Sequence, residues 1–165
     1  MDDKTVAIIK RLVHQHRQHD YIVRLAIDVP LSVDHIHGGH LNHVGRVKSA
    51  DGKKSCIVKV YMNYVKFLGP EMPIETERCE REYLASHYFR SIVPDCCPLS
   101  YFYDDVHNIG FLEDFPEHQE WGQTLCTHCD VDSGAKLADI LVALHGSSYR
   151  GKLRQTEFDM LSKKF

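Results

Sequence analysis

One lysine interrupts an apolar run that has the pattern of a half-buried strand. In Ser55-Cys56-Ile57-Val58-Lys59-Val60-Tyr61, Lys59 is the only charged residue. A cation there needs an anionic partner, because an unpaired buried charge is costly. One available partner is a phosphate group under the turn Gly38-Gly39, where the backbone can come close. The other is a helix carboxylate, Glu80 or Glu82. Alternatively, Lys59 lies at a sheet edge and extends into water, and spacing alone favours this interpretation.

Histidines surround the same turn in the sequence. His35, His37, His40 and His43 could belong to a metal site if their rings converged. His35 and His37 share one face of a strand, but His40 and His43 follow the turn and need not meet them. The spacing therefore favours polar histidines of a hairpin, which gain charge below about pH 6.5 and attract phosphate.

The six cysteines offer a second candidate metal site. Cys126 and Cys129, with His128 between them, have half of the spacing of a zinc knuckle, and Cys96-Cys97 could complete it only if the fold brought the pairs together. An even count of cysteines in a chain of 165 residues without a signal peptide indicates reduced thiols. We expect no metal ligands in either motif.

Hydrophobic periodicity predicts the elements that position these residues. Val6, Ile9 and Val13 lie at helical spacing, Asp51-Gly52 favours a hairpin, and 69–73 has the glycine and prolines of a loop. We expect Gly146 to end the helix that precedes it. In chain order the expected elements are a helix at 2–19, strands at 31–36, 44–47 and 55–61, a helix at 75–92, strands at 99–103 and 109–112, and helices at 133–145 and 153–163. Five strands with one inserted helix make an α+β fold, and its first three strands form an antiparallel meander.

Composition excludes several classes of protein. Apolar residues make up 43% and charged residues 26% of the chain, which is typical of a globular protein. The net charge of −3 offers no general basic surface, so we expect no nucleic-acid partner. No apolar run reaches the roughly 20 residues that cross a bilayer, and the acidic N-terminus is unlike a secretory signal. We expect a cytoplasmic protein with no membrane partner.

Several segments together resemble the nucleotide-binding lobe of 5-methylthioribose kinases, which are small-molecule kinases with the protein-kinase fold. The resemblance covers roughly residues 31–165. It rests on the loop Gly38–Asn42, the strand Ile57-Val58-Lys59, the link Asn63–Ile74, the helix start Arg78-Cys79-Glu80, the segment Leu112-Glu113-Asp114-Phe115, and the helix Lys136–His145 followed by Ser147-Ser148-Tyr149. It implies a kinase-like N-terminal lobe at 1–115, followed at 116–165 by a linker and the first helices of a truncated C-terminal lobe.

The resemblance also implies roles for individual residues. Lys59 would bind the α- and β-phosphates of ATP, and Glu80 would orient it. The phosphate loop would contain Gly38, Gly39, His40 and Asn42; backbone groups of Glu113, Asp114 and Phe115 would bind adenine; and Val44 and Ile57 would cover the ring. The family transfers a phosphoryl group from ATP, with Mg²⁺, to methylthioribose in methionine salvage, which implies ATP and a small sugar acceptor as ligands.

The sequence departs from the family pattern beyond Phe115. Phosphoryl transfer in this fold needs a His-x-Asp aspartate as base and a second acidic motif for Mg²⁺. His128-Cys129-Asp130 matches these letters but precedes the helix that should come before the catalytic loop, so we take it as a chance match. Within the loop and the link, Gly38, His40 and Met72 replace residues typical of the family. We therefore expect an ATP-binding lobe that is inactive as this chain; the alternative is a non-catalytic, pseudokinase-like interaction protein, with a homodimer as a candidate assembly.

Overall fold

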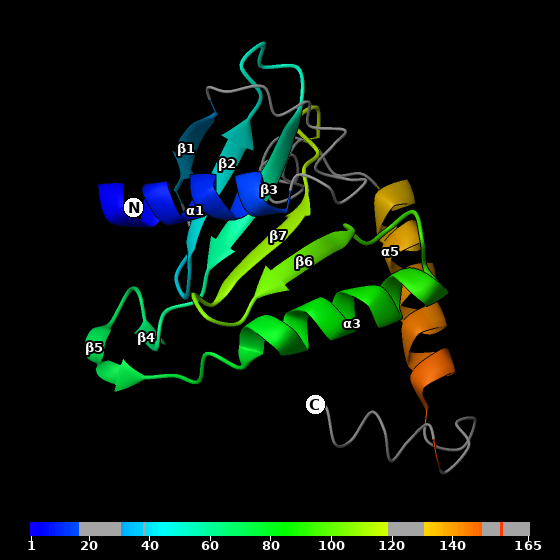
Figure 1. Cartoon of the computed structure of the whole chain (residues 1–165). Coiled ribbons are helices and arrows are strands. Elements are labelled where there is room, and N and C mark those ends of the chain that lie inside the picture. The colour runs from blue at the N-terminus through cyan, green and yellow to red at the C-terminus, as the bar shows by residue number, and fades with distance from the viewer. Residues whose placement is uncertain (17–30, 38, 119–130, 150–155, 157–165) are drawn as a thin grey trace. The chain divides into compact units, whose positions relative to one another are not determined.

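The centre of the structure is a five-stranded antiparallel sheet with the strand order β1-β2-β3-β7-β6 (Figure 1). The computed structural model describes residues 1–16, 31–37, 39–118, 131–149 and 156. The strands are β1 (Ser32–Ile36), β2 (His43–Lys48), β3 (Ser55–Val60), β6 (Ser100–Asp104) and β7 (Ile109–Glu113). One helix, α3 (Arg78–Ile92), is inserted between β3 and β6 of this sheet. This arrangement confirms the predicted α+β class and all five strands.

The chain divides into two compact units. The first contains Met1–Leu84 and Leu99–Asp114, and the second contains Ala85–Pro98 and Phe115–Phe165. The sheet lies in the first unit. The second unit contains the C-terminal half of α3, where Ser86 and Arg90 donate hydrogen bonds to the carbonyl oxygens of Pro98 and Cys97.

The first three strands form the predicted meander. Residues of β1 and β2 pair from Ser32↔Lys48 to Ile36↔Val44, and those of β2 and β3 pair from His43↔Val60 to Lys48↔Ser55. The hairpin between β2 and β3 turns at Gly52, whose φ of 69° favours glycine. Ser49 closes this hairpin, because its hydroxyl accepts from the Lys54 N–H at 3.1 Å and donates to Asp51 at 2.6 Å.

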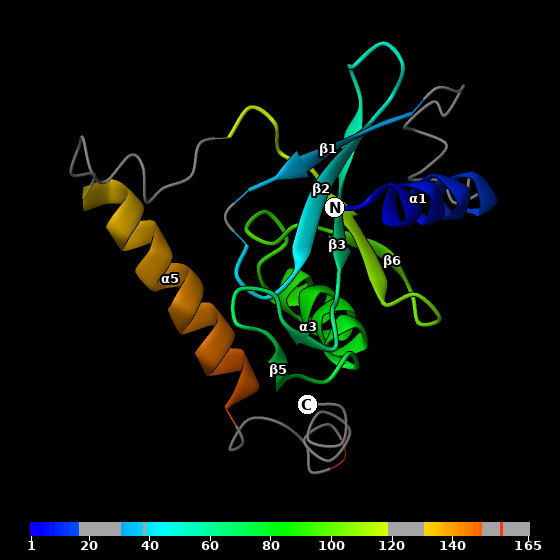
Figure 2. The same ribbon diagram turned by 90° about the vertical axis from the view of Figure 1, so that its left-hand side faces the viewer.

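Helix α1 (Asp3–Gln15) covers one face of the sheet (Figures 1 and 2). Asp2 caps the helix by accepting a hydrogen bond from the Thr5 N–H at 2.7 Å, and this bond lowers the pKa of Asp2. The buried residues of α1 join the alternate residues of β2 and β3 that face it, and two stacked aromatic rings of β6 and β7 complete the core. The core contains Ile9, Leu12, Val13, Val47, Cys56, Val58, Val60, Phe102, Ile109 and Phe111.

Three expectations need correction. The expected loop at 69–73 is the second strand of a small hairpin, β4 (Tyr64–Val65) with β5 (Gly69–Pro73). Helix α3 begins at Arg78 rather than at Glu75. Helix α5 (Val131–Ser148) continues through Gly146, because glycine weakens a helix without forcing it to end.

Two expected helical segments fall on residues that the structure does not describe. One is the end of the helix expected at 2–19, and the other is the whole helix expected at 153–163 apart from Thr156. No helix in the described ranges is long and apolar enough to cross a membrane.

Candidate functional site

Lys59 lies in a central strand, on the face of the sheet opposite α1. It pairs with Val44 of β2 and with Gly110 of β7, so β3 has neighbours on both sides. Cys56, Val58 and Val60 point into the core, and the alternation of a strand therefore directs Ile57 and Lys59 to the other face. The Lys59 side chain is 29% exposed and forms an ion pair with Glu82. The alternative of a solvated lysine at a sheet edge is wrong.

The structure corrects the expected helix partner of Lys59 from Glu80 to Glu82, the other carboxylate that the sequence left open. Side chains two positions apart on a helix, such as those of Glu80 and Glu82, differ in direction by about 200°. Both therefore cannot point at the same strand. Glu80 instead forms a side-chain hydrogen bond with Tyr103; burial, followed by the charge of Glu80 and this bond, raises the pKa of Tyr103. It lines a cavity of about 330 Å³ together with Tyr103 and Asp105.

The sequence pattern did not indicate Tyr61, a buried residue that forms a hydrogen bond with Glu82, as part of the site. Tyr61 is 4% exposed. Burial, followed by the charge of Glu82 and a hydrogen bond with it, raises the pKa of Tyr61, so the phenol stays protonated. Glu82 thus contacts a cation and a phenol at once. Tyr61 and Lys59 lie two positions apart, which places them on one face of an extended chain and could have indicated this contact.

The glycine-containing loop contacts two other segments of the first unit. Gly38 lies outside the described residues. A Cβ on Gly39 would lie 3.1 Å from the Asn42 carbonyl oxygen, so the backbone is tightly folded there. The His40 carbonyl oxygen accepts from the Phe67 N–H at 2.9 Å, and the two rings meet edge to face. The Asn42 amide oxygen accepts from Arg78 at 2.6 Å, a contact between residues 36 apart in sequence.

Two of the residues expected near adenine, Val44 and Ile57, lie on the Lys59 face. Val44 and Ile57 are half-buried and belong to adjacent strands on that face, where Leu112 of β7 is paired with Ile57. These apolar side chains form a surface next to Lys59 that suits a flat aromatic ring.

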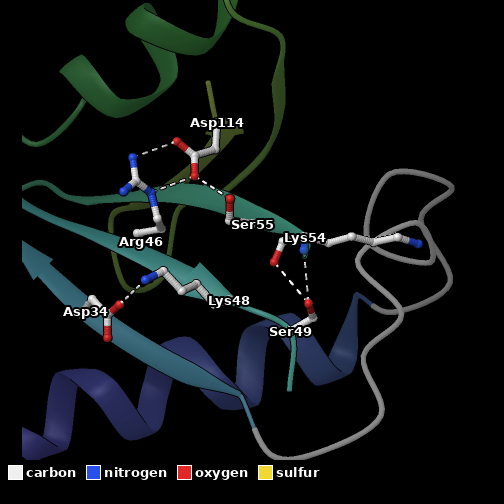
Figure 3. A network of polar contacts seen from close by, with 7 residues as sticks. All are labelled: Asp34, Arg46, Lys48, Ser49, Lys54, Ser55 and Asp114. Carbon is white, nitrogen blue, oxygen red and sulfur yellow. Dashed lines mark hydrogen bonds and ion pairs between the residues drawn. The ribbon is translucent and has the colours of Figure 1, made fainter. Parts of the chain in front are cut away.

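The segment after β7 is anchored through its side chains. Glu113 exchanges hydrogen bonds with Leu99, donating its N–H to the Leu99 carbonyl at 2.8 Å and accepting the Leu99 N–H at 2.9 Å. Asp114 is 3% exposed and accepts two hydrogen bonds from Arg46, at 2.7 and 3.1 Å, and one from Ser55 (Figure 3). Phe115 begins the next stretch of the second unit and contacts the ring of His118. The side chains of Glu113 and Asp114 thus fix the end of the sheet.

The histidines of β1 and β2 gather on the face that carries α1. The ring centroid of His35 lies 4.5 Å from that of His37 and 6.0 Å from that of His43. Within the part of the chain that the structure describes, His35 Nε2 and His43 Nδ1 are buried without hydrogen-bond partners. Among the described residues, no three His, Cys, Asp or Glu side chains are placed to hold a metal ion. Cys126, His128 and Cys129, the candidate zinc ligands, lie outside the described residues. Of the described cysteines, Cys56 and Cys79 are buried, and burial raises the pKa of both thiols to about 12.

This histidine cluster predicts acid sensitivity. Burial, and the nearby charges of the N-terminal amine and Lys66, lower the pKa of both His35 and His43 from 6.5. Below pH 6.5 the unfolded chain therefore binds protons that the fold does not, and the free energy of unfolding falls as the pH falls. Urea denaturation at pH 7.5 and 5.5 should show a smaller loss in a His35→Gln, His43→Gln double variant than in wild type. An equal loss would contradict the prediction.

No family model matches the chain, but curated relatives do. Methylthioribose kinase of Bacillus cereus strain B4264 is 37% identical over 76 residues, which are 46% of this chain and 19% of the relative. Methylthioribose kinase of Geobacillus sp. strain WCH70 is 36% identical over 90 residues, 54% of this chain and 22% of the relative. Methylthioribose kinase of Bacillus cereus strain AH187 is 31% identical over 102 residues, which are 62% of this chain and 25% of the relative. This chain resembles methylthioribose kinases over about half of its length.

The matches confirm the resemblance that the motifs indicated, and they limit it. They cover a quarter or less of each kinase's length. Together with the five-stranded sheet and its inserted helix, they identify the architecture as that of a kinase-like N-terminal lobe.

Proposed function

We propose that residues 1–115 form an ATP-binding lobe of a small-molecule kinase, and that 116–165 are a linker and the start of a second lobe. The observation that carries the proposal is the Lys59–Glu82 pair, which lies on the sheet face opposite α1. A lysine held by a helix glutamate is the group with which kinase folds bind nucleotide phosphates. The similarity to methylthioribose kinases supports the same assignment.

ATP would lie along the Lys59 face. Lys59 would bind the α- and β-phosphates, with Glu82 holding its ammonium in place. The loop containing Gly38, Gly39, His40 and Asn42 would approach the phosphates with backbone groups, since glycines allow close contact. Adenine would lie against Val44 and Ile57, with its edge on backbone groups of Glu113 and Asp114 at the end of β7.

Mg²⁺ would reach this lobe with the nucleotide. Among the described residues no cluster of acids is placed to hold a metal ion, and Glu82 is engaged by Lys59. The phosphate oxygens would supply some of its ligands, and we expect the acidic side chains that hold the ion in the second lobe. When bound, the ion neutralises phosphate charge.

We extend the proposal to phosphoryl transfer only for a protein that also supplies a catalytic base. Such a protein would transfer the γ-phosphoryl of ATP to a small sugar such as methylthioribose, as in methionine salvage, in the cytoplasm. Beyond Phe115 this sequence offers no His-x-Asp motif with a following asparagine, so we expect the chain itself to bind ATP without turnover.

Calorimetric titration of the purified chain with adenosine, AMP, ADP and ATP, each with Mg²⁺, tests the proposal. Affinity should rise with the number of phosphates, because Lys59 and the loop contact phosphate. Light scattering on the same sample gives the oligomeric state. An obligate oligomer that binds none of these ligands would contradict the proposal and favour a pseudokinase-like interaction protein.

A further inference from the structure

Arg78, the first residue of α3, joins three segments of the first unit. Its guanidinium donates to the Asn42 amide oxygen in the glycine-containing loop at 2.6 Å and to the Met62 carbonyl oxygen after β3 at 2.7 Å. It also lies over the ring of Tyr61, 5.1 Å from the centroid. Partial burial lowers the pKa of Arg78. The planar guanidinium of an arginine, with its several N–H donors, is the side-chain group that can make all these contacts at once.

The contacts of Arg78 continue to the proposed phosphate-binding lysine. Tyr61, which lies beneath the guanidinium, forms a hydrogen bond with Glu82, and Glu82 pairs with Lys59. The loop amide at one end and the lysine ammonium at the other are therefore joined through one continuous set of polar and cation–π contacts. Every link lies within Met1–Leu84.

We propose that Arg78 is a positioning residue, which fixes the glycine-containing loop relative to the Lys59–Glu82 pair so that both contact the same nucleotide phosphates. The inference rests on the proposed function and adds to it the residue that couples its two phosphate-binding elements. Its physical basis is preorganisation: a loop already held in place loses less conformational freedom when the ligand binds.

Arg78→Lys tests the proposal, because it keeps the positive charge and removes the planar guanidinium that donates to Asn42 and Met62 together. The readout is the ratio of adenosine to ATP dissociation constants, which isolates the contribution of the phosphates. We expect Arg78→Lys to lower this ratio about tenfold and to leave adenosine affinity unchanged. Arg81→Lys is the matched control, since Arg81 lies on the same helix in a half-exposed pair with Glu75, and it should leave the ratio unchanged.

Asn42→Ala keeps the proposal testable if the Arg78 variant fails to fold. Asn42 lies in the loop, and its substitution should lower the ratio as Arg78→Lys does. The double variant should be no worse than either single one, because both remove the same contact. A wild-type ratio near one overturns the proposed function and this inference with it. A high wild-type ratio that either folded variant retains overturns only the role of Arg78.

Discussion

Lys59→Met is expected to remove most of the affinity of the chain for ATP while leaving the fold intact. The charge-assisted contact of an ammonium with phosphate contributes on the order of 1.5–3 kcal/mol, so its loss should weaken ATP binding roughly 10- to 100-fold. Methionine retains the apolar stem that packs in β3. The ion pair with Glu82 is partly exposed, and its loss should lower the free energy of unfolding by less than about 1 kcal/mol. Calorimetry and thermal melts with and without ATP measure both effects.

Lys48→Met is the matched control for this change. Lys48 lies on the same face, in the neighbouring strand β2, and pairs with Asp34 at 2.7 Å (Figure 3). It carries the same charge but lies at the other end of the strand from Val44, which is the partner of Lys59. Equal ATP binding by Lys59→Met and Lys48→Met would show that only net charge matters and would reject Lys59 as the phosphate ligand.

The second large effect is on stability, and we expect it from Asp114→Ala. The Asp114 carboxylate is 3% exposed and accepts from Arg46 and Ser55, which lie on two different strands (Figure 3). Its removal leaves the guanidinium and the hydroxyl without their partner at the end of the sheet. Breaking such a pair should lower the free energy of unfolding by about 2–4 kcal/mol. Urea denaturation measures the change.

Asp34→Ala provides the comparison for Asp114→Ala. Asp34 also pairs with a cation across two strands, but its side chain is 53% exposed. Water replaces the lost contact there, so the change should be below about 1 kcal/mol. If the two variants were equally stable, the anchoring role of Asp114 would be refuted.

Periodicity predicted the sheet because the strands have one buried face. Along β3 the core residues alternate with partly exposed ones, and this pattern is visible in the sequence. The β4–β5 hairpin was missed because its residues are mostly exposed and it contains glycine and two prolines, which are typical of loops. The end of α5 was misplaced because a single glycine does not determine where a helix stops.

The candidate site was predictable in its local parts and not in its long-range ones. Lys59 could be recognised within one strand, because a charge in an apolar run is a local anomaly. The choice between Glu80 and Glu82 depends on how α3 is rotated toward β3, which no local pattern specifies. The pairs Arg46–Asp114 and Arg78–Asn42 join residues 68 and 36 apart in sequence, so only the folded chain brings them together.

The central claim is that ATP binds on the Lys59 face of the sheet, and amide NMR of the ¹⁵N-labelled chain tests it most directly. Addition of ATP with Mg²⁺ should shift the amide resonances of Gly39, Asn42, Lys59 and Glu113. The resonances of α1, on the opposite face, should stay in place. Shifts confined to α1, or no shifts at saturating ATP, would contradict the account.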